Sequence, residues 1–154
     1  DDETIIASSF RLGINKYNTN KEIDFEVNNQ LVQLAKKHKL QVVFHRAFDF
    51  CIDPIIGLNQ LIELKFDRLL TSGQEPKAID GKELIQELVK LSKGRIEIMA
   101  GSGVNFSNVE QIIQTGVNAI HFTGTKIAED VKLGMGVKYK VDEQKIASIM
   151  KFKS

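Results

Sequence analysis

Residues whose types suit binding or catalysis gather directly after four of the β-rich runs in this sequence. These four segments are 45–49, 71–74, 100–104 and 121–125. They combine imidazole, guanidinium, carboxylate and hydroxyl side chains with glycines, which are the groups used for proton transfer and for holding anions. If the runs are parallel strands of a barrel, their ends meet at one rim, and we expect one site there.

The glycines of the last two segments indicate an anion site. Gly101 and Gly103 follow one run and Gly124 follows the next. Glycine lets backbone N–H groups approach a phosphate closely, although the same glycines could serve only as tight turns between a strand and a helix. The two loops together favour ligand binding, and we expect Ser72 and Gly73 to contribute at the same rim.

Arg46 and Asp49 are three residues apart in the first segment. They could form a local ion pair that shapes the rim, or Arg46 could clamp an anionic ligand. His45 and His121 are predicted to lie on the inward face of the strands, near the rim, where two imidazoles could ligate a metal, transfer protons or hydrogen-bond to neighbours. His45 and Asp49 are the candidates for proton transfer.

Cys51 is the single cysteine, so this chain has no intramolecular disulfide, which is typical of a reducing, cytoplasmic compartment. Its thiolate could bind Cu(I), but one cysteine does not make a site, and a small buried apolar residue is the preferred interpretation. Cys51, His45 and His121 are therefore the candidates for a metal site.

Five β-rich runs alternate with segments of helical periodicity, at residues 5–10, 40–45, 67–71, 95–100 and 118–123. This alternation predicts an α/β fold with a parallel sheet. We expect helices to begin after Asp53, Asp80 and Ser107, and to end at Gly94 and Gly116.

One face of these runs is apolar and the other is mixed, which favours part of a barrel over an open sheet covered on both faces. We expect Arg68, Arg95 and Glu97 to project inward and to form an ionic layer. Five strands cannot close a barrel, and the two open edges would favour a homo-oligomer. Residues 11–21 read as a polar loop.

The composition limits the classes of binding partner that can be expected. A formal net charge of +1 over 154 residues gives no reason to expect binding to nucleic acid, and no apolar run is long enough for a membrane span. The acidic first residues also lack an initiator methionine, which suggests that the sequence starts inside a longer protein.

Four motifs resemble the copper homeostasis protein CutC family, at residues 44–49, 70–74, 96–105 and 120–124. The resemblance spans about residues 23–125. It implies a (βα)8 TIM-barrel fold in which residues 1–154 form a single domain that carries strands four to eight, with the N-terminal βα units missing.

The resemblance also implies a function in cytosolic copper homeostasis through Cu(I) binding, with copper as the bound metal and cysteines of the N-terminal half as its ligands. Those cysteine positions are not in this chain. The residues themselves support an alternative, a barrel enzyme acting on a small phosphorylated or anionic metabolite at the rim. A third interpretation is a truncated product without activity.

Overall fold

The computed structural model describes residues 4–6, 10–11, 22–130 and 137–152. Its centre is a five-stranded sheet in the order β1-β4-β5-β6-β7, and all four neighbouring pairs are parallel. The strands are β1 (Thr4–Ile6), β4 (Gln41–Phe44), β5 (Arg68–Thr71), β6 (Glu97–Gly101) and β7 (Ala119–His121). The predicted α/β fold with a parallel sheet is confirmed.

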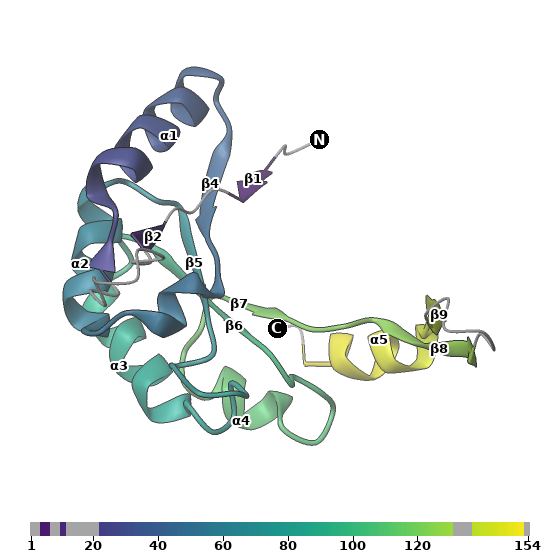
Figure 1. The fold of residues 1–154 in the computed structure, drawn as a ribbon. Helices are drawn as coiled ribbons and strands as arrows, with labels where there is room; N and C mark the ends of the chain where they lie inside the picture. The colour runs from purple at the N-terminus through teal and green to yellow at the C-terminus, as the bar shows by residue number, and fades with distance from the viewer. Residues whose placement is uncertain (1–3, 7–9, 12–21, 131–136, 153–154) are drawn as a thin grey trace, which may run out of the picture.

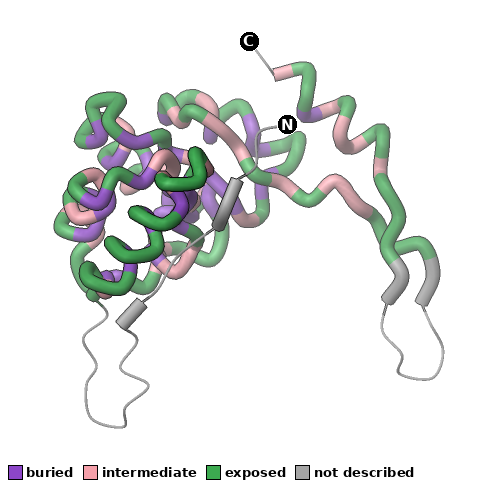
Figure 2. The backbone as a smooth tube through the Cα atoms, turned by 90° about the horizontal axis from the view of Figure 1, so that it is seen from above, coloured by how far each residue is buried: buried purple, intermediate pink, exposed green. Residues whose placement is uncertain are grey.

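Helices cover one face of this sheet (Figure 1). They are α1 (Phe25–Lys37), α2 (Pro54–Glu63), α3 (Lys82–Ser92) and α4 (Val109–Ile113), and the 3-10 helix η1 (Arg46–Phe50) lies between β4 and α2. The buried residues concentrate between the sheet and these helices, as Figure 2 shows. Phe44, Leu69 and Ile98 point into this layer and are fully buried.

The predicted helix ends are partly confirmed. The Asp53 carboxylate accepts from the N–H groups of Ile55 and Ile56, so it caps α2 as expected. Gly94 and Gly116 have positive φ angles of 72° and 86°, which suits the predicted helix ends.

Two predicted helix starts are wrong. The helix α3 begins after Gly81 and has no side-chain cap, so Asp80 does not cap it. Ser107 donates to the side-chain oxygen of Asn105, while Asn108 is the residue that precedes α4. In both places the local turn has other hydrogen-bond partners, and a spacing rule in the sequence does not show them.

The opposite face of the sheet is more open. Arg68 pairs with Glu97 across β5 and β6, with 2.5 Å between Nη2 and Oε2, so the predicted ion pair exists. Its side chains are 32% and 51% exposed, because no element covers them in the described part of the chain. Arg95 does not join this pair: it donates to the carbonyls of Leu91 and Ser92 at the end of α3.

A C-terminal arm follows β7 and extends away from the sheet (Figure 1). It consists of an antiparallel hairpin, β8 (Thr125–Asp130) and β9 (Val137–Val141), and the helix α5 (Glu143–Met150). The hairpin was not predicted. Near the other end of the chain, the run predicted at 5–10 is divided into β1 and β2 (Phe10–Arg11), and β2 pairs with β3 (Glu22–Ile23).

Most of the predicted loop at 11–21 lies outside the described residues. No helix in the described part of the chain is long and apolar enough to cross a membrane. That residues 1–154 form a single domain, and that the open edges cause self-association, stay predictions.

Candidate functional site

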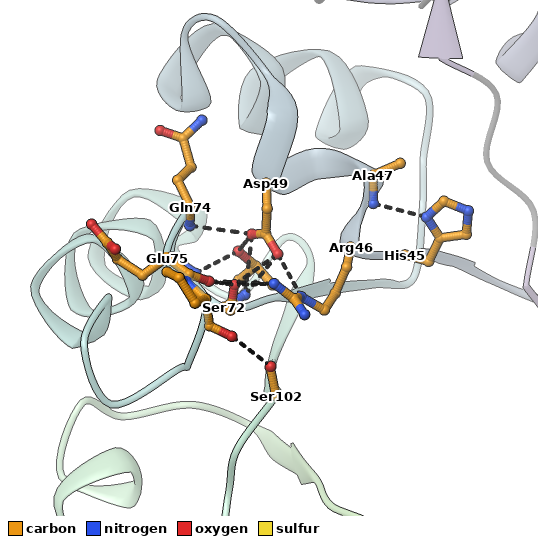
Figure 3. Close-up of polar contacts among 11 residues, drawn as sticks. His45, Arg46, Ala47, Asp49, Ser72, Gln74, Glu75 and Ser102 are labelled. Atoms are coloured by element: carbon orange, nitrogen blue, oxygen red, sulfur yellow. Dashed lines mark hydrogen bonds and ion pairs between the residues drawn. The ribbon is translucent and has the colours of Figure 1, made fainter.

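The best-connected polar residue at the rim is Asp49 in η1. The Asp49 side chain is 5% exposed, and its carboxylate accepts from Arg46 Nε at 2.7 Å and from Thr71 Oγ1 at 2.5 Å. It also accepts from the hydroxyl of Ser72 at 2.9 Å and from the N–H of Gln74 at 3.3 Å, as drawn in Figure 3. Asp49 therefore ties η1 to the loop after β5.

These bonds bear on the chemistry expected of Asp49. A carboxylate whose oxygens already accept from several donors has few lone pairs left to accept a substrate proton. The geometry therefore favours a positioning role for Asp49 over a role in proton transfer.

Arg46 is the residue that Asp49 positions. Its Nη2 atom donates to the Ser72 hydroxyl at 2.7 Å and to the carbonyl of Glu75 at 3.3 Å. Among the described residues, Nη1 has no acceptor, and the side chain is 40% exposed. One edge of a firmly held guanidinium group thus remains for a ligand.

A pocket of about 450 Å³ opens at this rim, a volume suited to a small molecule. The start of η1, the strand β5, the loop after β6, the end of β7 and the helix α5 contribute to its wall. The residues that matter below are Arg46, Ser102, Gly103, His121 and Lys145. Two of its described wall residues are cations, and none is a carboxylate. The pocket is therefore suited to an anion.

The loop after β6 borders this pocket in an unusual conformation. Ser102 and Gly103 have φ angles of 88° and 66°, and a positive φ is uncommon for serine. The Ser102 hydroxyl donates to the carbonyl of Pro76 at 2.7 Å, and the Ser102 carbonyl accepts from the N–H of Ala78 at 3.0 Å. These bonds hold the loop in place. In the described chain, the N–H groups of Gly103 and Val104 have no acceptor.

The glycines predicted to bind a ligand differ in whether they border the pocket or are closely packed against other residues. Gly103 borders the pocket. An added Cβ at Gly101 would lie 2.6 Å from Leu70 Cδ1, and one at Gly124 would lie 3.0 Å from Ile146 Cγ1 and Cδ1. Gly73 has a φ of 70°, and its Cβ would meet the Gly81 carbonyl. Close packing accounts for Gly73, Gly101 and Gly124, which do not border this pocket.

The structure separates the two histidines. His121 borders the pocket, whereas His45 precedes η1 and its Nδ1 accepts from the N–H of Ala47 at 2.9 Å. Figure 3 shows the His45 ring apart from the polar cluster around Asp49. Both imidazoles are exposed. Within the described ranges, no three His, Cys, Asp or Glu side chains are close enough together to hold a metal ion.

Cys51 is buried, with 6% exposure, as predicted. Burial, and to a smaller extent the charges of the nearby Asp49 and Asp53 carboxylates, raise the pKa of its thiol to about 12. The thiol is therefore neutral at physiological pH, which disfavours it as a copper ligand because the thiolate is the form that binds metals.

Lys145 is the pocket residue that the sequence analysis missed. A signal for it exists in the spacing of α5, because Lys145, Ile149 and Phe152 follow the i, i+4, i+7 pattern of one helix face. A lysine on the same helix face as two apolar residues indicates that the apolar face packs against the protein and that the lysine lies at its edge.

The sequence model of the CutC family matches residues 7–126. A family protein CutC of Glaesserella parasuis serovar 5 is 42% identical over 164 aligned residues, which cover 96% of this chain and 67% of the relative. A family protein CutC of Pasteurella multocida is 45% identical over 104 residues, and this match covers 67% of this chain and 42% of the relative.

Solved structures give the same assignment. A CutC structure from Streptococcus agalactiae matches with a TM-score of 0.60 and 38% identity, over 68% of this chain and 51% of that one. A structure described as native KDPGal matches with a TM-score of 0.57 at 18% identity, which supports the fold alone. The chain thus spans about half the length of the solved CutC protein. Its sequence and its fold agree, and the chain belongs to the CutC family.

Proposed function

We propose that this CutC-family chain binds a small anionic metabolite, with a phosphorylated compound as the expected class, in the pocket at the rim of its parallel sheet. The observation that carries this proposal is the wall of the pocket, where Arg46 and Lys145 supply positive charge and no described residue supplies a carboxylate. An anion placed there gains charge-assisted hydrogen bonds without facing a like charge.

Arg46 is the central residue of this proposal. Its Nε and Nη2 atoms are engaged by Asp49 and Ser72, so the guanidinium group is held before a ligand arrives. A group that is already ordered loses less conformational entropy on binding. If the bound metabolite is also a substrate, His121 is better placed than His45 for proton transfer, because only His121 borders the pocket.

A titration with inorganic phosphate at constant ionic strength tests this proposal. We expect saturable binding to the unmodified chain and about tenfold weaker binding to Arg46→Gln, the size expected for loss of one charge-assisted hydrogen bond. Arg68→Gln is the matched control, because Arg68 lies outside the pocket, and it should bind normally. Absence of saturable binding, or equal loss in both variants, would contradict the proposal.

A second candidate function is cytoplasmic copper homeostasis with Cu(I) as the ligand. It is favoured by the family assignment, because the S. agalactiae relative is named for copper homeostasis. In this chain the candidate ligands are Cys51, His45 and His121. Cys51 is a neutral buried thiol, and the described residues contain no cluster of three metal-binding side chains.

Titration with Cu(I) under reducing conditions, against a competing chelator, separates the two candidates. We expect the Cys51→Ser variant to bind as much Cu(I) as the unmodified chain, because the folded thiol is protonated. Stoichiometric binding that disappears in the variant would make Cys51 a ligand and favour the copper function.

The Cys51 thiol also makes the stability of the fold depend on pH. Its pKa rises from the ordinary value of 9.0 to about 12 in the folded chain, so between these values unfolding releases a proton. Stability from this group is therefore complete below pH 9.0 and is lost as the pH rises toward about 12. Urea denaturation of the chain and of Cys51→Ser across this range should show a steeper loss for the unmodified chain. Parallel curves would contradict the neutral buried thiol.

A further inference from the structure

The face of helix α5 that contacts the rest of the molecule carries both apolar residues and a lysine. Ile149 on this helix is 2% exposed, and the Phe152 ring lies 5.9 Å from the ring of Phe106, which is in the segment between β6 and α4. Ile146 packs against Gly124. Lys145 comes one turn before Ile149 on the same face and borders the rim pocket. Apolar contacts thus hold α5 where its first turn brings a cation to the pocket.

The side chain of Lys145 is available to a ligand. Its backbone N–H donates to Asp142 Oδ1 at 3.1 Å, but among the described residues its ammonium group forms no ion pair or hydrogen bond. The nearby Asp142 carboxylate already has a partner, since Lys126 Nζ lies 3.6 Å from it. The backbone N–H of Lys145, the nearby Lys126 ammonium group and, to a smaller extent, the charge of Lys145 itself hold the pKa of Asp142 below its usual range. The Lys145 ammonium group thus feels the Asp142 charge but forms no ion pair with it among the described residues.

Other walls of the same pocket carry complementary donors. Arg46 offers its free Nη1, and the loop after β6 offers the N–H groups of Gly103 and Val104, which lack acceptors in the described chain. A phosphoryl group carries up to two charges and three oxygens that accept strong hydrogen bonds, so it can use donors from several walls at once. A carboxylate has two oxygens and one charge and can use fewer of them.

We infer that Lys145 is a ligand-binding residue, and that the C-terminal helix α5 is the wall of the pocket that selects a phosphoryl group. This inference rests on the proposed function. It adds that the phosphoryl oxygens contact the Lys145 ammonium group and the N–H groups of Gly103 and Val104 together, so binding joins the C-terminal arm to the end of β6.

Variants of two lysines on the same helix segment test this inference. Lys145→Gln removes the proposed contact, and Lys151→Gln removes an exposed lysine at the end of α5, outside the pocket. In a titration with inorganic phosphate followed by backbone amide NMR signals, we expect Lys145→Gln to bind about tenfold more weakly. Lys151→Gln should bind as the unmodified chain does.

Two further readouts report on the mechanism rather than on affinity alone. Phosphate should shift the amide signals of Gly103 and Val104 in the unmodified chain. It should also slow hydrogen exchange in α5, and this slowing should be absent in Lys145→Gln.

Acetate at the same ionic strength should bind more weakly than phosphate, and this preference for phosphate should shrink in Lys145→Gln. Lys145→Arg, which keeps the charge, should retain phosphate binding and separates a lost contact from a damaged helix.

The outcomes distinguish this inference from the proposed function. If the unmodified chain does not bind phosphate, the proposed function and this inference both fail. If Arg46→Gln weakens binding while Lys145→Gln behaves like Lys151→Gln, the anion site stands and the role of Lys145 is overturned. Loss of binding in Lys145→Gln with rescue in Lys145→Arg supports the inference.

Discussion

The two faces of the five-stranded sheet differ in burial and in chemistry, and adjacent leucines on β5 show the contrast. Leu69 points toward the helices and is fully buried. Leu70 points to the other face, where it is only partly buried and borders the rim pocket. The helix-covered face therefore supplies most of the stability, while the open face and its rim hold the charged pair and the proposed ligand site.

The largest expected effect tests this contrast within one strand. Leu69→Ala should lower the free energy of unfolding by about 3 kcal/mol, since it leaves a cavity in a packed layer. Leu70→Ala should cost only about 1 kcal/mol, because part of this side chain is already in contact with solvent. Urea denaturation of both variants measures the difference, and similar losses would show that the two faces contribute equally.

The next effect concerns the polar cluster at the rim. Asp49→Asn should lower the free energy of unfolding by about 2 kcal/mol, because a buried acceptor of bonds from Arg46, Thr71 and Ser72 loses its charge. Asp53→Asn is the matched control: it keeps a good cap for α2 and should be nearly neutral. Thermal denaturation followed by circular dichroism compares the two, and an unaffected Asp49→Asn would remove Asp49 from its positioning role.

A smaller effect is expected where the sheet meets the rim. Gly101→Ala would place a Cβ 2.6 Å from Leu70 Cδ1, the end of a flexible side chain, so we expect a cost of about 1 kcal/mol. Combining it with Leu70→Ala should recover part of this cost, because the smaller residue makes room. A double-mutant cycle on unfolding free energies checks the coupling. Strict additivity would show that Leu70 does not fill the space beside Gly101.

The smallest effect belongs to the ion pair of the open face. Glu97→Gln should change the free energy of unfolding by less than about 0.5 kcal/mol, because Arg68 and Glu97 are both substantially exposed to water. Denaturation at low and at high salt checks this value. A loss as large as that of Asp49→Asn would mean that this face is covered in solution.

Local sequence patterns predicted the elements better than the site. The strands β4, β5 and β7 lie within the predicted runs, and β6 extends one residue beyond its run, because apolar alternation and the following helix capping residues are local signals. The hairpin β8–β9 was missed: β8 alternates weakly and ends in two acidic residues, whereas β9 alternates strictly between apolar residues and lysines, a strand signal that the prediction did not use. Asp80 and Ser107 failed as caps because their turns use other hydrogen bonds.

For the site, the sequence identified the rim and most of its chemical groups, but not their partners. Arg46, Gly103 and His121 border the pocket, whereas Gly101 and Gly124 are closely packed and do not border it, and Lys145 comes from a helix far along the chain. No local sequence pattern predicts which face of α5 packs near the segment after β6, because that contact depends on how Ile149 and Phe152 pack.

The sequence by itself determined the family, the parallel α/β fold and the edge at which the chemical groups collect, because these follow from motifs and from alternation along each strand. The tertiary structure decided the rest. It showed that Asp49 is saturated by donors, that the Arg68–Glu97 pair is open to solvent, and that Lys145 joins Arg46 at one pocket. Such facts depend on distances between segments remote in sequence, which only packing of the whole chain sets.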